Sequence, residues 1–252
     1  IASVLGQTFR AFEVIVVDDA SQDGVRDWLV SVADRLPFSL VVLAASGRGA
    51  ARARNQGVAG ARADLLLFLD ADTIPQDDLI RQHLDIQHRY HDPALCLMGK
   101  IVMSPELKTV EQARWNELDM PVRSKDIVEI DHRRYRTANT SMRKEKFNEA
   151  GGFNPGFIIS EDLECAYRLA QSGAHFYYHD AIVAVHHHPI NIHEYIHKGC
   201  SYGKDMAYWF RINPELRLEL AQRMGLYHSS LPLAQKCRYV LKRMIVNNLT
   251  IN

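Results

Sequence analysis

Short runs of apolar residues alternate with segments of helical period in the first part of this chain. The apolar runs cover residues 12–19, 39–46 and 64–72, and helical segments follow the last two runs at 50–60 and 75–90. Strands that are apolar at almost every position are typical of sheets buried on both faces, and the helices between them supply the crossovers that parallel strands need. The pattern therefore predicts an α/β fold with a mainly parallel sheet flanked by helices.

Acidic residues end two of these runs. Asp18 and Asp19 close the first, and Asp70 and Asp72 close the third, in the stretch LLLFLDADTIP. In sheets of this kind ligands bind beyond the carboxyl ends of the strands. We therefore expect these carboxylates to lie along one edge of the sheet, at a ligand site.

Composition narrows the class of protein. The chain has 252 residues, with 30 Lys and Arg against 30 Asp and Glu, so bulk charge gives no reason to expect a nucleic-acid partner. Its four cysteines are widely spaced, which is typical of reduced thiols in a cytoplasmic protein rather than of a disulfide framework or a zinc site. We expect a cytoplasmic location, with the inner face of the membrane as a further option.

The Asp70-Ala-Asp72 motif is the first candidate for chemistry. Side chains two residues apart on an extended segment point the same way, so both carboxylates can face one Mg²⁺ or Mn²⁺ ion. A solvated turn would explain the motif equally well. A phosphatase of the haloacid-dehalogenase type also ends a strand in such a motif, but its threonine would stand one place later than Thr73.

Several longer motifs occur in a characteristic order. They are SVLGQTFRAFEVIVVDDASQDG, GAARARNQGVAGARADLLLFLDADT, TANTSMRKEKFNEAGGFNPGF, SEDLECAYRLAQSG and VAVHHHP. This set resembles the family 2 glycosyltransferases, which are inverting, nucleotide-sugar-dependent enzymes of the GT-A fold. The resemblance implies a GT-A domain over 1–205, with a nucleotide-sugar half at 1–100 and an acceptor half at 101–205, and a helical extension over 206–252. It also implies that the family's first strand precedes the residues seen at the N-terminus.

The resemblance assigns donor contacts to a set of polar residues. Asp18 and Asp19 would hold the nucleobase and ribose, and Arg54 and Asn55 would line the donor pocket. Asp70 would touch the ribose or a metal-bound water, and Lys204 would reach the diphosphate. Asp72 would bind the divalent metal. A solvated surface lysine is the plainer explanation of Lys204.

A second acidic pair lies at the predicted start of a helix. Ser160 is a suitable N-cap, which puts Glu161 and Asp162 in the first turn, where the helix dipole favours negative charge. An ionised carboxylate there can take a proton from an acceptor hydroxyl. By resemblance Asp162 is the general base, and Glu161 orients it or binds the acceptor.

Three consecutive histidines follow an apolar strand. His186 and His188 share one face of an extended segment and His187 takes the other. Neutral imidazole binds Mn²⁺ together with carboxylates. The family often supplies a metal ligand from this strand, so His186 is the first candidate and His188 the second.

The motifs together predict a metal-dependent transferase that moves a sugar from a nucleotide-diphosphate donor to an acceptor hydroxyl. Its acceptor would belong to polysaccharide, lipid-linked glycan or cell-envelope synthesis, and Mn²⁺ or Mg²⁺ would be the cofactor. A basic apolar stripe at 233–244 allows peripheral contact with a membrane. Two other functions stay open at this point, namely the phosphatase and a non-catalytic nucleotide-sugar or glycan-binding domain.

Overall fold

A computed structural model describes residues 1–106, 126–189 and 191–216. The chain divides into two units, residues 1–191 and 192–252. The boundary at 205/206 between a glycosyltransferase domain and a helical extension stays a prediction. That position lies within α8, which runs from Ile192 to Ile212 in the second unit. The predicted helix at 106–119 and the basic stripe at 233–244 lie outside the described residues.

The first unit contains all eight described strands. They are β1 (Glu13–Asp18), β2 (Ser39–Ala44), β3 (Leu65–Leu69), β4 (Thr73–Pro75), β5 (Leu95–Met103), β6 (Val128–Glu129), β7 (Asn139–Arg143) and β8 (His175–His186). Its helices are α1 (Ala2–Leu5), α2 (Val25–Val32), α3 (Ala50–Gly60), α4 (Leu79–Tyr90), α6 (Lys144–Glu149) and α7 (Glu161–Gln171), with short 3₁₀ turns η1 (Ala33–Arg35) and η2 (His132–Arg134). The second unit contributes α8 and the turn η3 (Pro214–Leu216).

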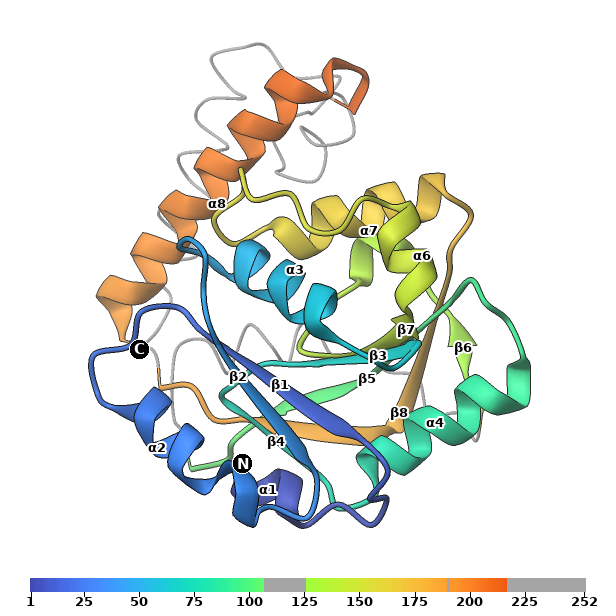
Figure 1. Cartoon of the computed structure of the whole chain (residues 1–252). Helices are drawn as coiled ribbons and strands as arrows, with labels where there is room; N and C mark the ends of the chain where they lie inside the picture. Colours follow the sequence, from blue (N-terminus) through green and yellow to red (C-terminus); the bar gives the residue numbers. More distant parts are fainter. Residues whose placement is uncertain (107–125, 190, 217–252) are drawn as a thin grey trace. The chain divides into compact units, whose positions relative to one another are not determined.

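The strands form two hydrogen-bonded sheets. β1 and β2 pair in parallel, and a six-stranded sheet has the order β3-β7-β5-β8-β4, with β6 also paired to β8 (Figure 1). The α/β class and the helix-flanked sheet agree with the sequence prediction. The strand directions differ from it, because in the larger sheet only β5 and β8 are parallel, whereas β7 inserts antiparallel between β3 and β5. A short apolar run does not encode the direction of its partner.

Helices cover both faces of the larger sheet. In β3, Leu66 packs on one face with α3, α6 and α7, and Leu67 packs on the other with α4. The same alternation places Cys96 and Leu97 of β5 on opposite faces. Both faces of these strands are therefore buried, which explains why their sequences are apolar at successive positions. Among the described residues, none of the helices combines the length and the hydropathy needed to cross a membrane.

A buried polar network joins α4 to the middle of the sheet. His83 is fully buried, with Nε2 2.9 Å from Asn139 Oδ1 and Nδ1 2.9 Å from Ser141 Oγ. The amide nitrogen of Asn139 donates to the carbonyl oxygens of Lys100 and Ile182, so its oxygen faces the ring. The imidazole therefore carries its proton on Nε2 and accepts from Ser141. Burial, only partly offset by the Asn139 hydrogen bond, lowers the pKa of His83 to about 4.

This network makes the stability of the fold depend on pH. Between pH 6.5 and 4 the unfolded chain binds a proton at His83 that the folded chain excludes, so the free energy of unfolding falls as the pH falls through this window. Replacing His83 with Gln, which does not titrate, removes this dependence. We expect wild type to lose about 2 kcal/mol more than His83→Gln between pH 7 and pH 5. Urea unfolding at both pH values measures the difference, and parallel losses would contradict the burial of a neutral His83.

Candidate active site

The pairing of β4 with β8 brings the aspartate motif to the histidine run. Thr73 lies opposite His186 in this antiparallel pair, and the backbone N–H of His187 donates to the carbonyl oxygen of Asp72 at 2.8 Å. The hydroxyl and the N–H of Thr73 both donate to the carbonyl oxygen of Asp70, at 2.6 and 3.1 Å. These bonds fix the Asp70-Ala-Asp72 turn beside the end of β8.

Asp70, Asp72 and His186 then form a compact group of potential metal ligands. One side-chain atom of each lies within 4.8 Å of the others. His186 Nε2 is 3.2 Å from one oxygen of Asp72, and His188 Nδ1 is 3.1 Å from the other. The prediction that His186 and His188 lie on the same side is therefore confirmed. The hydrogen bond from His186, with the nearby His188, lowers the pKa of Asp72. Two carboxylates and an imidazole fit Mn²⁺ or Mg²⁺ by their chemistry.

Arg54 of α3 neutralises charge at this group from the other side. Its Nη2 lies 2.8 Å from Asp70 Oδ1, and its Nη1 lies 2.5 Å from Glu161 Oε1. The guanidinium also lies over the ring of Phe153, with 5.7 Å between Cζ and the ring centroid. Burial disfavours the charge on Arg54, but Asp70 and Glu161 outweigh it and the pKa of Arg54 is raised. The fold thus supplies the cation that the sequence around Asp70 lacks.

The acidic pair lies at the first turn of α7, as predicted. Ser160 is the N-cap residue, Glu161 is buried and Asp162 is partly buried. Burial, together with the neighbouring Asp162, raises the pKa of Glu161. Burial also raises the pKa of Asp162, against the opposing charges of Arg136 and Arg54. The sequence alone does not single out Arg136, because nothing separates it from the other basic residues of the stretch DHRRYR.

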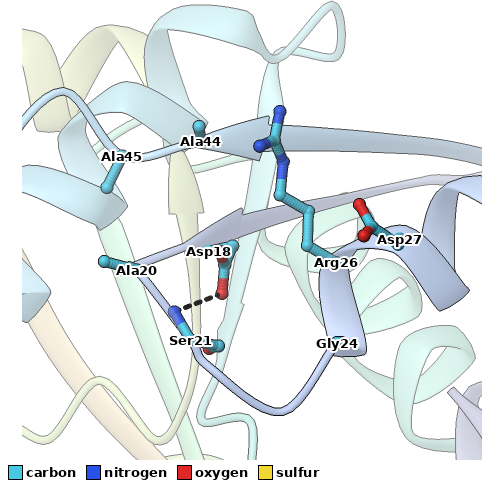
Figure 2. Close-up of a pocket in the computed structure, with 8 residues that line it drawn as sticks. All are labelled: Asp18, Ala20, Ser21, Gly24, Arg26, Asp27, Ala44 and Ala45. Carbon is cyan, nitrogen blue, oxygen red and sulfur yellow. Dashed lines mark hydrogen bonds between the residues drawn. The ribbon is translucent and has the colours of Figure 1, made fainter.

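Asp18 and Asp19 contact different parts of the fold. Asp18 Oδ1 accepts from the N–H of Ser21 at 3.2 Å, and it lines a pocket of about 380 Å³ beside the start of α2 (Figure 2). Asp19 Oδ2 accepts from the N–H of Gly49 at 2.8 Å, and Gly49 is the N-cap of α3. Asp19 is therefore tied to the helix that carries Arg54, whereas Asp18 is held in the loop before α2.

Asn55 makes two hydrogen bonds to the backbone of Phe153, directly after the Gly151–Gly152 turn, and we call this pair of bonds the Asn55 clamp. Its amide nitrogen donates to the carbonyl oxygen of Phe153 at 2.8 Å, and its oxygen accepts from the Phe153 N–H at 2.9 Å. Both polar groups of Asn55 are thus engaged with backbone, a contact that the sequence did not predict. Its contact with a donor stays a prediction. Lys204 lies on α8 in the second unit, and its contact with a diphosphate also stays a prediction.

The sequence model of Glycosyl transferase family 2 matches residues 1–155 of this chain. The chain belongs to this family. A pre-mycofactocin glycosyltransferase of Mycobacterium tuberculosis is 26% identical over 207 residues, which are 79% of this chain and 43% of that protein. A validoxylamine A glucosyltransferase of Streptomyces hygroscopicus is 31% identical over 190 residues, or 64% of this chain and 44% of that protein. A hyaluronan synthase of Pasteurella multocida is 27% identical over 214 residues, which are 73% of this chain and 22% of that protein. The chain therefore spans less than half the length of these three family members.

Solved structures of glycosyltransferases share the fold at lower identity. TarS of S. aureus in complex with UDP-GlcNAc superposes with a TM-score of 0.61 and 15% identity, covering 100% of this chain and 68% of that one. GalNAc-T7 with UDP, GalNAc and Mn²⁺ superposes with a TM-score of 0.60 and 16% identity, covering 75% of this chain and 40% of that one. The predicted GT-A fold is confirmed by these neighbours.

The Asn55 clamp makes Gly152 sensitive to substitution. Gly152 has φ +69°, and a Cβ there would lie 2.9 Å from Asn55 Oδ1 and 3.3 Å from Phe147 Cε1. Gly173 has φ +82°, and a Cβ added there would meet nothing within 4 Å, so it is a matched control for backbone strain alone. We expect Gly152→Ala to cost at least about 1 kcal/mol more than Gly173→Ala, which itself costs about 1–2 kcal/mol. Urea unfolding of both variants checks this, and equal losses would show that Asn55 yields without cost.

Proposed function

We propose that this chain is the catalytic domain of a metal-dependent, inverting glycosyltransferase. It would transfer a sugar from a nucleotide-diphosphate donor to an acceptor hydroxyl, in the cytoplasm, during polysaccharide, lipid-linked glycan or cell-envelope synthesis. One observation carries the proposal: the Asp70, Asp72 and His186 group and the Glu161–Asp162 pair lie at opposite ends of the ion pairs made by Arg54. The proposed leaving-group site and the proposed proton acceptor would thus be adjacent, as sugar transfer requires.

On the donor side, Asp18 and Asp19 would hold the base and the ribose, and Lys204 would reach the diphosphate. Asp72, Asp70 and His186, with His188 as a further ligand, would hold Mn²⁺ or Mg²⁺. When bound, the metal would stabilise negative charge on the leaving diphosphate. Structural neighbours crystallised with UDP, UDP-GlcNAc or Mn²⁺ support a uridine nucleotide as the first donor to test.

On the acceptor side, Asp162 is the proposed general base. Its raised pKa brings it closer to the working range of a base that takes a proton from a hydroxyl. As the acceptor oxygen bonds to the anomeric carbon, its proton passes to Asp162 and the bond from that carbon to the diphosphate oxygen breaks. The attack comes from the face opposite the leaving group, so the anomeric configuration inverts.

The phosphatase and the non-catalytic binding domain, which the sequence left open, differ in the support they receive. Family membership gives no support to a phosphatase built on Asp70, and Asp70 Oδ1 is engaged by Arg54. A silent nucleotide-sugar-binding domain would have the same fold and would bind the donor without turnover. Binding and turnover therefore have to be measured separately.

The first test is calorimetric binding of UDP, GDP, CDP and dTDP with and without Mn²⁺. We expect one nucleotide to bind in a Mn²⁺-dependent manner, and Asp72→Asn to weaken that binding on the order of 10–100-fold by removing a metal ligand. Asp77→Asn, on the loop before α4, is the control for a surface aspartate. Absence of binding for all four nucleotides to folded protein would refute the proposal.

The second test separates an enzyme from a binding domain. Hydrolysis of the matching nucleotide sugar, with water as the acceptor, reports turnover without knowledge of the natural acceptor. Asp162→Asn should reduce this rate by about 10²–10⁴-fold because the general base is lost. Its affinity for the nucleotide should stay near that of wild type. Donor binding with no turnover by wild type, across sugar donors and candidate acceptors, would favour the silent binding domain.

A further inference from the structure

Arg54 is the one residue that touches both acidic groups of the described site. The residues that it joins come from distant parts of the chain, since Glu161 is 107 positions away and Asp70 is 16. Its two ion pairs use different nitrogens, Nη1 for Glu161 and Nη2 for Asp70. A planar guanidinium can hold two carboxylates at a fixed separation in this way, whereas the single ammonium of lysine cannot impose that geometry.

Each of the two carboxylates is held by one oxygen only. Asp70 gives Oδ1 to Arg54 and also belongs to the group that can bind a cation. Glu161 gives Oε1 to Arg54, while its Oε2 is buried and has no hydrogen-bond partner in the described part of the chain. A buried carboxylate oxygen without a donor is costly. The ion pair between Arg54 and Oε1 is therefore the contact that compensates the charge of Glu161.

Phe153 helps to fix the position of the Arg54 side chain. Its guanidinium lies over the ring of Phe153, and the next residue on α3, Asn55, makes two hydrogen bonds to the backbone of Phe153. Adjacent residues of one helix thus hold the ring and the cation that stacks on it. This arrangement limits the freedom of Arg54 to follow a ligand.

We infer that Arg54 is a positioning residue that holds Asp70 and Glu161 by one oxygen each, so that the Asp70, Asp72 and His186 group and the Glu161–Asp162 pair keep a fixed separation. The inference rests on the proposed function and changes the role given to Arg54 by the resemblance, from a donor contact to a shared ion-pair partner.

The ion pairs can be tested without any ligand. Arg54→Met leaves Glu161 buried and unpaired, and we expect its Tm to fall by roughly 4–10 °C. In the double variant Arg54→Met/Glu161→Gln the buried charge is gone, so more than half of the loss should be recovered. Arg89→Ala breaks a pair with Asp126 in which both side chains are exposed, and it serves as the control, with little change expected. No recovery in the double variant would overturn the pairing on which the inference depends.

The positioning role is tested by separating KM from kcat. With Mn²⁺ and UDP-glucose or UDP-GlcNAc as probe donors, Arg54→Lys should keep KM and UDP affinity within about threefold while kcat for donor hydrolysis falls by about 10–100-fold. A raised KM at unchanged kcat would make Arg54 a donor ligand and overturn the inference. Wild-type kinetics in Arg54→Lys would also overturn it, because charge alone would then be sufficient.

Glu161→Gln tests the pairing from the side of the carboxylate. Glutamine keeps an oxygen for Arg54 but removes the charge that holds the guanidinium, so the fold should persist while turnover falls by about tenfold or more. Wild-type turnover would overturn the inference. If wild type binds no nucleotide, the proposed function fails, while the unfolding series still decides the role of Arg54.

Discussion

The two ion pairs of Arg54 allow this fold to collect carboxylates that would otherwise repel one another. Asp70, Asp72, Glu161 and Asp162 converge on one region, and like charges at such separations destabilise a folded chain unless cations or hydrogen bonds compensate. Arg54 compensates two of them directly, and His186 and His188 contact a third. Burial nevertheless raises the pKa of Glu161 and of Asp162, against the charges of the neighbouring arginines. Excess carboxylate charge in a buried region favours the uptake of a cation or a proton.

Backbone pairing determines where these side chains meet. The three-residue strand β4 pairs with the last residues of β8, and this short ladder brings the aspartate turn to the histidines. Strand β7 inserts antiparallel between β3 and β5, and α7 follows it in the chain, so Glu161 returns to the carboxyl end of β3, where Asp70 lies. Hydrogen bonds between His83 of α4 and the side chains of Asn139 and Ser141 help to fix that inserted strand. The geometry of the site therefore depends on interactions made well away from it.

Local sequence patterns predicted the parts of this structure that depend on local forces. The apolar runs at 12–19 and 64–72 became β1 and β3, and Ser160 occupies the N-cap position of α7, although its side chain makes no capping hydrogen bond. Strand burial and helix starts depend on patterns within a few residues of sequence. The approach of His186 to Asp72 could be inferred only through the family resemblance. The pairing of Arg54 with Glu161, the charge of Arg136 beside Asp162 and the antiparallel insertion of β7 depend on residues far apart in sequence. No periodicity or spacing encodes such contacts in a single chain.

Glu161 and Asp162 are neighbours in sequence, yet the structure gives them different surroundings, and this difference bears on which of them can act as a base. Glu161 is the more buried and has one oxygen committed to Arg54, so taking up a proton there would weaken an ion pair that also orients Asp70. Asp162 accepts a hydrogen bond from the N–H of Leu163 at 2.7 Å, and its pKa is raised by burial against the opposing charges of Arg136 and Arg54. Protonating Asp162 therefore disturbs less of the structure than protonating Glu161. Two adjacent carboxylates in unequal environments divide into a fixed group and a titrating one, and this difference favours Asp162 over Glu161 in the proposed role of general base.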